Sequence, residues 1–349
     1  MREALTKIVA TIGPASEKKE IIEQMARGGV DVFRLNLKHS SLNWHFKVIK
    51  KIREVSFEIK KPVPILVDVP EQLKFRKNFL FSLVDYIAVS FTQSKRDIEK
   101  FRKIVPDWVK IVAKIEDRNG IKNFNSILAS ADGIMIARGD LAKQIPFEKL
   151  PYYQKTFIKK ATEEGKPTIV ATEMLKSMVE SKFPTRAEIS DIANAILDYA
   201  DALMLSEETA IGKYPVLSVK MMEKICLFWE KKRDLPFNFD FKVNTQPAAV
   251  AFSAWQLWIK CFQKKFAVKA FLVLTKTGTM ARMLSRLKPK IPILALTNDK
   301  KIQHQLSLYF GVYPFLTKER LYQKRGPQEI RKLLNLAKKN FNLKTQDRI

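Results

Sequence analysis

The chain has 349 residues, of which 46% are hydrophobic and 28% charged, so it can form two domains or one large barrel with an appendage. No apolar run is long enough to cross a bilayer, and the first residues, MREALTKIVATIG, lack the apolar core of a signal peptide, so neither a membrane nor a secreted protein is expected. The net charge of +27 is spread in short lysine runs without a basic tail or an aromatic-and-basic stripe, which favours a solvated basic surface over a nucleic-acid partner.

Short runs rich in β-branched residues alternate with amphipathic segments along the first two thirds of the chain. The predicted strands are 7–13, 31–37, 64–69, 85–91, 110–116, 132–138, 167–173 and 201–207. Helical periodicity follows most of them, as in 17–29, 94–104, 119–131, 184–198 and 215–232. Eight such units predict an α/β fold in which a parallel sheet closes into a (β/α)8 TIM barrel. An open doubly wound sheet is the alternative, but no G-x-G-x-x-G motif follows the first strand.

The alternation restarts in the last third of the chain. A helix at 247–265, strands at 270–276, 292–298 and 312–317, and a last helix at 327–340 predict a smaller, three-layer α/β domain. We therefore place the barrel at 1–234 and the second domain at 235–349. Two cysteines, Cys226 and Cys261, cannot cross-link a fold of this size, which favours the reducing cytoplasm.

Polar residues gather at the carboxyl ends of the predicted barrel strands, where such barrels carry their chemistry. In chain order they are Arg34, Asn36, Lys38, Asp68, Lys114, Glu116, Asp140, Thr172, Ser206 and Glu208. A buried charge is costly unless it is paired or meets a ligand, so this rim is either an ion-pair network or a site for ions and anions. Two carboxylates from neighbouring strands suit Mg2+ or Mn2+, and arginine and lysine near them suit a phosphate group. The three histidines, His39, His45 and His304, are too scattered for a zinc site.

Several longer stretches resemble the pyruvate kinase family between about residues 6 and 340. They are KIVATIGPAS, FRLNLKHS, DYIAVSF, AKIEDRNGI, DGIMIARGDL, EEGKPTIVATEMLKSM, PTRAEISDIANAILDYADALMLSEETAIGKYP and LSRLKPKIPILALTNDKK. The resemblance implies a glycolytic transferase that binds phosphoenolpyruvate and transfers its phosphoryl group to ADP, giving pyruvate and ATP. It also implies a divalent cation, Mg2+ or Mn2+, a potassium ion and assembly into dimers or tetramers.

The resemblance also assigns roles to the residues that handle the substrate. Lys114 would neutralise the transferring phosphoryl group, and Arg34 would bind the phosphate of phosphoenolpyruvate. Gly139 and Asp140 would meet the substrate carboxylate and its metal. Thr172 would line the face where the enolate of pyruvate takes up its proton. Such chemistry depends on positioning and charge neutralisation more than on covalent catalysis.

The remaining roles concern the ions, the nucleotide and the polar surroundings. Glu116 and Asp140 would hold the divalent cation, and Asn36 and Asp68 would belong to the monovalent-cation site. His39 falls where the family contacts the nucleotide. Ser206 and Glu208 would form a polar shell behind the proton-transfer step.

The chain departs from the family pattern where a small lid domain would be inserted after the third strand, at 69–84. Only sixteen residues separate Asp68 from Asp85, too few for a domain. Lys74, Arg76 and Lys77 in this segment either replace some positive charge or form a solvated turn. Because a lid excludes water and clamps the nucleotide, transfer to ADP without it is expected to be slow, open to hydrolysis or lost.

A second departure is Lys38, which stands where the family usually has a hydroxyl that helps bind potassium. One hypothesis is that the Lys38 ammonium replaces K+ and pairs with Asp68; the alternative is a lysine turned into solvent. Glu173 and Glu207 are acidic where the family tends to have Gln and Gly, either weakening anion binding or lying on the surface.

The second domain departs from the pattern in its effector loop. TKTGTMAR (275–282) resembles the hydroxyl-rich loop that holds a sugar phosphate, with Thr275, Thr277 and Thr279 kept but Met280 in place of a small polar residue. The last residues, LKTQDRI, come before the strands that would complete that pocket. We therefore expect reduced or absent allosteric control.

Two further functions stay open from the sequence. One is a lyase or decarboxylase that uses a metal-stabilised pyruvate enolate and needs no nucleotide. The other is a non-catalytic regulatory or binding subunit.

Overall fold

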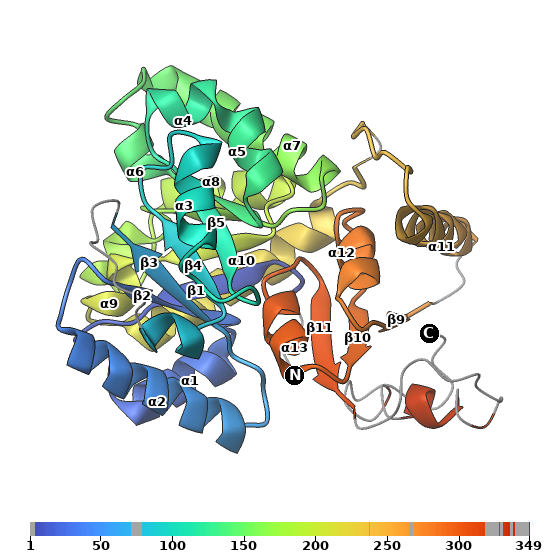
Figure 1. Ribbon diagram of the computed structural model, residues 1–349, viewed down its shortest axis with the longest axis horizontal. Helices are drawn as coiled ribbons and strands as arrows, with labels where there is room; N and C mark the ends of the chain where they lie inside the picture. The colour runs from blue at the N-terminus through green and yellow to red at the C-terminus, as the bar shows by residue number, and fades with distance from the viewer. Residues whose placement is uncertain are drawn as a thin grey trace.

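The computed structural model describes residues 4–70, 79–236, 238–264 and 268–317, together with positions 328, 331–335, 338 and 349. Within these residues, eight parallel strands close into a barrel in chain order, and three further strands form a separate parallel sheet in the order β11-β10-β9 (Figure 1). The predicted TIM barrel followed by a smaller α/β domain is confirmed, and the open doubly wound alternative is wrong. The boundary at residue 234 stays a prediction, as does the helix at 327–340, most of which lies outside the described residues.

The strands lie inside the predicted ranges and end one or two residues earlier in all cases but one. The barrel strands are β1 (Lys7–Thr11), β2 (Val32–Asn36), β3 (Ile65–Val69), β4 (Tyr86–Val89), β5 (Lys110–Ile115), β6 (Gly133–Ala137), β7 (Thr168–Ala171) and β8 (Ala202–Leu205), and those of the second sheet are β9 (Phe271–Leu274), β10 (Ile293–Thr297) and β11 (Val312–Leu316). Several of the polar residues predicted to end strands therefore lie just beyond the hydrogen-bonded ladder, in the loops at the barrel mouth.

Helices follow the strands in both domains; those up to residue 232 belong to the barrel and those from residue 246 to the second domain. They are α1 (Lys19–Gly28), α2 (Leu42–Glu58), α3 (Lys95–Arg102), α4 (Arg118–Lys122), α5 (Phe124–Ser130), α6 (Arg138–Leu141), α7 (Leu150–Glu163), α8 (Arg186–Leu197), α9 (Glu207–Ala210), α10 (Pro215–Lys232), α11 (Gln246–Gln263), α12 (Thr279–Ser285) and α13 (Lys300–Leu306), with 3-10 turns η1 (Phe79–Leu83), η2 (Phe147–Lys149) and η3 (Lys176–Val179). The start of α8 shows why the sequence folds this way. Thr185 and Glu188 form a reciprocal capping box that satisfies the first free amides of the helix.

Alternate residues of each barrel strand enter two separate apolar cores. On β1, Ile8 packs outward against the helices, whereas Val9 packs into the barrel interior. Leu308 of the second domain belongs to the interior cluster, and the Tyr86 hydroxyl donates to the carbonyl of Gln305. The second domain therefore closes the amino-terminal end of the barrel, and the opposite mouth is left for the polar strand ends.

Charged groups are buried where the second domain meets the barrel. Lys288 is fully buried, and its Nζ lies 2.7 Å from Asp201 Oδ1, just before β8. Arg233, also buried, donates from Nη2 to the Lys288 carbonyl at 3.1 Å and lies over the Phe310 ring. Burial lowers the pKa of Lys288 to about 8, although Asp201 opposes the shift. Burial likewise lowers the pKa of Arg233 to about 10.

The depressed pKa of Lys288 predicts a pH-dependent stability. Between pH 8 and 10 the folded protein has released this proton while the unfolded chain still binds it, so stability rises with pH, by about 2 kcal/mol over this range for this group. Urea unfolding of the wild type and of Lys288→Met at pH 8, 9 and 10 measures the effect. The wild type should gain stability relative to the variant as pH rises, and parallel pH profiles would contradict the assignment.

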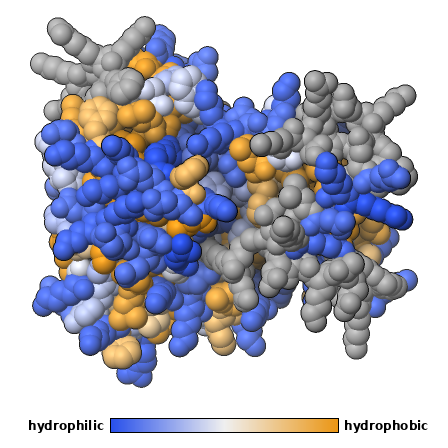
Figure 2. Space-filling model, turned by 90° about the horizontal axis from the view of Figure 1, so that it is seen from below, coloured by the Kyte–Doolittle hydropathy of each residue, from blue (hydrophilic) through white to orange (hydrophobic). Residues whose placement is uncertain are grey.

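Some of the lysines are solvated groups on the surface. Figure 2 shows one face covered mainly by hydrophilic side chains with scattered hydrophobic ones. The lysine side chains at 100 and 143 are 76% and 75% exposed, in agreement with the predicted basic surface. In the described part of the chain, no helix combines the length and the apolar character needed to span a membrane.

Candidate active site at the mouth of the barrel

The predicted polar residues meet in one cleft at the carboxyl ends of the barrel strands. A cavity of about 110 Å3 is lined by Arg34, Asn36, Lys38, Lys114, Glu116, Asp140, Thr172 and Ser206 around a floor of Met135, Ala137, Ala171 and Met204. It shares Asp140, Thr172 and Ser206 with an adjoining cavity of about 190 Å3, which Gly139 and Glu208 also line. Strands distant in sequence therefore bring ten of the twelve predicted site residues to one place. Asp68 lies directly behind this cleft, and His39 is exposed outside it.

Asp68 is the centre of the charge network behind the cleft. Its Oδ2 accepts from Arg34 Nη2 at 2.6 Å and from Arg34 Nε at 3.0 Å. Lys114 Nζ lies 3.0 Å from the same oxygen, and the Ser90 hydroxyl donates to Oδ1 at 3.1 Å. Burial alone would raise the pKa of Asp68, but Arg34 and Lys114 outweigh it and hold this pKa below its usual value. The two cations are thus fixed in place, and Arg34 is further held by the Thr11 hydroxyl at 3.0 Å.

Glu116 and Asp140 offer carboxylate oxygens to the cleft. Glu116 is 1% exposed; its Oε2 accepts from the Phe91 amide at 2.6 Å, and its Oε1 lies 3.0 Å from Lys114 Nζ. That Oε1 is nevertheless buried without a well-aligned hydrogen bond. Asp140 has a 40% exposed side chain on the same cleft. No cluster of three or more His, Cys, Asp or Glu with metal-ligand geometry is found among the described residues. Two carboxylates with one unsatisfied buried oxygen suit Mg2+, which takes its other ligands from water and substrate.

The residues do not fit a potassium ion in the same way. Both oxygens of Asp68 already accept from Arg34, Lys114 and Ser90, and Asn36 Oδ1 accepts from the Lys38 amide at 3.1 Å. Among the described ion pairs, Asp68 is bound by Arg34 and Lys114, and the hypothesised pair between Lys38 and Asp68 is not found. The Lys38 ammonium instead lies over the Phe91 ring, 5.5 Å from its centroid.

Thr172 adopts an unusual backbone conformation at the end of β7. Its φ is +73°, a region that β-branched residues rarely occupy, and Glu173 follows with φ +56°. The Thr172 hydroxyl accepts from the Gly139 amide at 2.7 Å and donates to the Ala171 carbonyl at 2.5 Å. The Gly139 amide is therefore engaged by Thr172, so a substrate carboxylate would have to compete for it.

Ser206 and Glu208 line the cleft just after the end of β8. Glu208 accepts from the Ser206 amide at 2.7 Å and from the Leu175 amide at 3.0 Å. Burial raises the pKa of Glu208 above its usual value despite these hydrogen bonds. The Ser206 hydroxyl oxygen is buried without a hydrogen-bond partner.

Two side chains of the charge network, Ser90 and Thr11, were not predicted, and Arg138, which lies at the end of a predicted strand in the quoted DGIMIARGDL stretch, was given no role. Ser90 and Thr11 complete the hydrogen bonds of the charge network, and Arg138 contacts the backbone of Thr172. Ser90, the second-last residue of the quoted DYIAVSF stretch, directly follows β4 and could have been found from the same strand-end rule. The segment with Lys74, Arg76 and Lys77 lies outside the described residues.

The other sequence departures are placed as follows. Glu173 lines the 190 Å3 cavity, but its side chain is 63% exposed and pairs with Lys176 at 3.2 Å. In the effector-like loop, Thr277 and Thr279 share a 2.9 Å hydrogen bond, and the Thr275 hydroxyl accepts from the Gly278 amide at 2.9 Å. The described hydroxyls of this loop are thus used within the loop itself.

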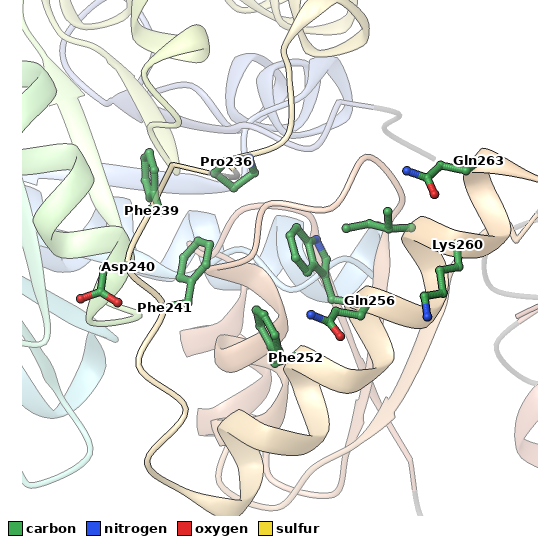
Figure 3. A pocket seen from close by; sticks show the side chains of 10 residues that line it. Pro236, Phe239, Asp240, Phe241, Phe252, Gln256, Lys260 and Gln263 are labelled. Carbon is green, nitrogen blue, oxygen red and sulfur yellow. The ribbon is translucent and has the colours of Figure 1, made fainter.

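Two larger cavities contain none of the predicted site residues. One, of about 690 Å3, lies by the amino-terminal end of β1 and the second domain. The other, of about 550 Å3, lies between residues 236–241 and α11 (Figure 3). Phe239 and Phe241 line one side and Phe252 the other, so aromatic rings face one another across this cavity. Size alone therefore does not identify the functional site; converging charge does.

Comparisons with known proteins agree with this geometry. The family model for the pyruvate kinase barrel domain matches residues 3–76 and 71–219, and that for the pyruvate kinase alpha/beta domain matches 259–349. The two barrel matches meet at 71–76, in the short connection between β3 and β4.

Whole relatives match most of the chain. Pyruvate kinase 2 of Synechocystis is 32% identical over an alignment that includes 98% of this chain and 75% of the relative. The pyruvate kinase of Thermococcus litoralis is 32% identical, with 91% of this chain and 90% of the relative covered. That of Agaricus bisporus is 43% identical over 66% of this chain and 44% of the relative. The alignment to the Synechocystis protein spans 451 positions, more than the 349 residues present here, so that relative carries residues without a counterpart. From its fold, its strand-end residues and these matches, the chain belongs to the pyruvate kinase family.

Proposed function

We propose that this protein transfers the phosphoryl group of phosphoenolpyruvate to ADP with the help of Mg2+, giving pyruvate and ATP. The observation that carries the proposal is that two nearly buried cations, Arg34 and Lys114, line one small cleft together with the carboxylates of Glu116 and Asp140. A phosphate ester with a metal ion is the ligand class that such a charge distribution binds.

The side chains divide the work of the reaction by their positions. Arg34 and Lys114 neutralise the phosphate, and Lys114, held by Asp68 and Glu116, stays beside the group during transfer. Such preorganised charge stabilises a transition state more than it stabilises a mobile ground state. The Thr172 hydroxyl lies on the same cleft and is the group placed to direct a proton to the enolate carbon.

Glu116 and Asp140 would hold the divalent cation. Mg2+, or Mn2+, would draw electron density from the phosphate and enolate oxygens. The buried Glu116 Oε1, whose 3.0 Å contact with Lys114 Nζ is not aligned as a hydrogen bond, is the proposed metal-binding atom. We also propose that Lys38 supplies the positive charge at this edge of the cleft that potassium supplies in relatives, and that turnover therefore does not need K+.

The nucleotide side of the site is the more open one. Because only sixteen residues join Asp68 to Asp85, we propose that the lid domain is missing and that ADP meets a site exposed to water. His39, exposed next to the cleft, is the proposed nucleotide contact. This openness favours one second candidate, decarboxylation through the same metal-bound pyruvate enolate, which needs no nucleotide.

The proposal extends to compartment and assembly. We propose glycolytic work in the cytoplasm, because a chain of this size with only two cysteines, Cys226 and Cys261, suits a reducing compartment. As in the resemblance, a homodimer or homotetramer is the proposed assembly.

Calorimetry of phosphoenolpyruvate binding with and without Mg2+ tests the site, and a coupled assay with ADP tests the reaction. We expect binding that needs Mg2+, and a Glu116→Gln variant should lose that dependence because it removes one metal-binding oxygen.

Running the assay with NaCl or KCl at equal ionic strength tests the Lys38 proposal, which strong potassium activation would contradict. Oxaloacetate decarboxylation without transfer to ADP would favour the second candidate, and no binding at all would exclude both.

A further inference from the structure

We propose that Arg138 is a positioning residue that holds Thr172 in its left-handed conformation and so directs the Thr172 hydroxyl for proton transfer to the enolate. The inference rests on the proposed function, because it concerns a step of that reaction. Arg138 itself lines neither cavity of the cleft, so its action must pass through another residue.

The contact between the two residues is direct and mostly buried. Arg138 is 8% exposed, and its Nη2 donates to the Thr172 carbonyl at 2.8 Å. Its Nε donates to the Ala171 carbonyl at 3.4 Å. One planar guanidinium therefore spans the two carbonyls at the point where β7 ends and the chain turns.

The turn needs such support because of its backbone conformation. Thr172 has φ +73° and Glu173 has φ +56°, and both are non-glycine residues. A β-branched residue keeps this conformation only when surrounding contacts determine it. This backbone conformation determines where the side chain points. It places the Thr172 hydroxyl 2.7 Å from the Gly139 nitrogen and at the cleft.

Arg138 is itself anchored from two helices. Its Nη1 lies 2.7 Å from Asp191 Oδ1 on α8 and donates to Gln154 Oε1 on α7 at 3.4 Å. Asp191 belongs to the PTRAEISD stretch, and Arg138 to the IMIARGD stretch. Two stretches separated by some fifty residues in sequence thus meet at one guanidinium, outside the substrate cleft.

The contacts of Arg138 with Thr172 also link Thr172 to Asp140, the proposed metal ligand. Arg138, Gly139 and Asp140 are consecutive in α6; the first two bind Thr172, and the third lines the cleft as a proposed metal ligand. The guanidinium and the Gly139 amide therefore fix the proton-directing hydroxyl relative to Asp140. A shift at Arg138 would misplace the hydroxyl without removing any group that binds phosphate.

The test uses the full chain with Arg138→Lys, Asp191→Asn and Thr172→Ala. A lysine keeps the charge but cannot span two carbonyls. Since a misplacement of about 1 Å can cost about a hundredfold in rate, Arg138→Lys should lower kcat about 10- to 100-fold. The KM for phosphoenolpyruvate should change less than about threefold, because Arg34 and Lys114 are untouched. Exchange of pyruvate methyl protons with solvent should fall by the same factor as kcat.

Asp191→Asn serves as the matched variant, because it loosens the anchor and leaves the guanidinium in place; its loss of kcat should be smaller. In the Thr172→Ala background, Arg138→Lys should cost almost nothing further, as expected for a residue that acts through Thr172. An additive loss of kcat in that double variant would overturn this inference but not the proposed function. A raised KM in Arg138→Lys with unchanged proton exchange would do the same. A wild type with neither transfer to ADP nor proton exchange would overturn the proposed function as well.

Discussion

Replacing Lys114 with methionine is expected to lower phosphoryl transfer by about a thousandfold or more, because the cation beside the transferring group is lost. Methionine keeps the length and apolar stem of lysine, so the strand should still pack. The KM for phosphoenolpyruvate should rise much less than kcat falls, since Arg34 remains fixed by Asp68 and Thr11. Steady-state kinetics in the ADP-coupled assay measures both quantities.

Lys110→Met is the matched control for this experiment. Lys110 lies on the same strand, β5, at its amino-terminal end, and its ion pair within the described part of the chain is with Asp132 at 3.8 Å. It is a quarter exposed and belongs to neither cavity of the cleft, so its variant should keep the wild-type rate within about twofold. A Lys114→Met enzyme that retained a tenth of the wild-type rate would show that the proposed charge neutralisation does not limit the reaction.

The fold was predictable because its determinants are local. Each barrel strand is a short β-branched run followed by a 3.6-residue apolar period, and eight repeats leave few topologies open. The predicted strands extend too far at their carboxyl ends. The alternation of polar and apolar residues continues past the last hydrogen-bonded residue of the sheet. The run 110–116, for example, keeps its pattern through Glu116, whereas β5 ends at Ile115.

The membership of the candidate site was also predictable, but its internal pairing was not. The rule that strands of a barrel end at one mouth placed Arg34, Lys114, Glu116 and Asp140 together, and the structure does so. The partner of Asp68 depends on how far side chains reach across β2, β3 and β5. Arg34 and Lys114 reach Asp68, in place of Lys38.

The left-handed turn at Thr172 was beyond sequence reasoning for a different reason. Threonine in a β-branched run predicts extended backbone, and only the tertiary contacts from Arg138 and Gly139 oppose that preference. Local propensity and global structure disagree here, at a residue of the cleft. Functional sites are where such disagreements are expected.

Replacing Asp68 with asparagine is expected to destabilise the fold by about 3–5 kcal/mol, the usual cost of leaving a buried charge without its partner. Asp68 is 1% exposed and stands between Arg34 and Lys114, so the change leaves both of these cations without their shared carboxylate. Because these partners hold its pKa below the usual value, the stabilisation is present above the unfolded pKa of about 3.8 and is lost as pH falls through the lower folded pKa. Urea unfolding at pH 7 should therefore show the full difference between wild type and variant, and the difference should shrink in acid.

Asp132→Asn gives the matched comparison, since Asp132 also lies between an arginine and a lysine, Arg102 and Lys110, but with a 26% exposed side chain. Solvent screens this pair, so its loss should cost about 1 kcal/mol. The two cations freed in Asp68→Asn should also bind inorganic phosphate, and phosphate should raise the thermal midpoint of that variant more than that of the wild type. Equal costs for the two asparagine variants, together with no added phosphate effect, would mean that Asp68 does not hold the cations of the cleft. In that case Arg34 and Lys114 would be placed by packing alone, and the cleft would be an anion site without its internal counter-charge.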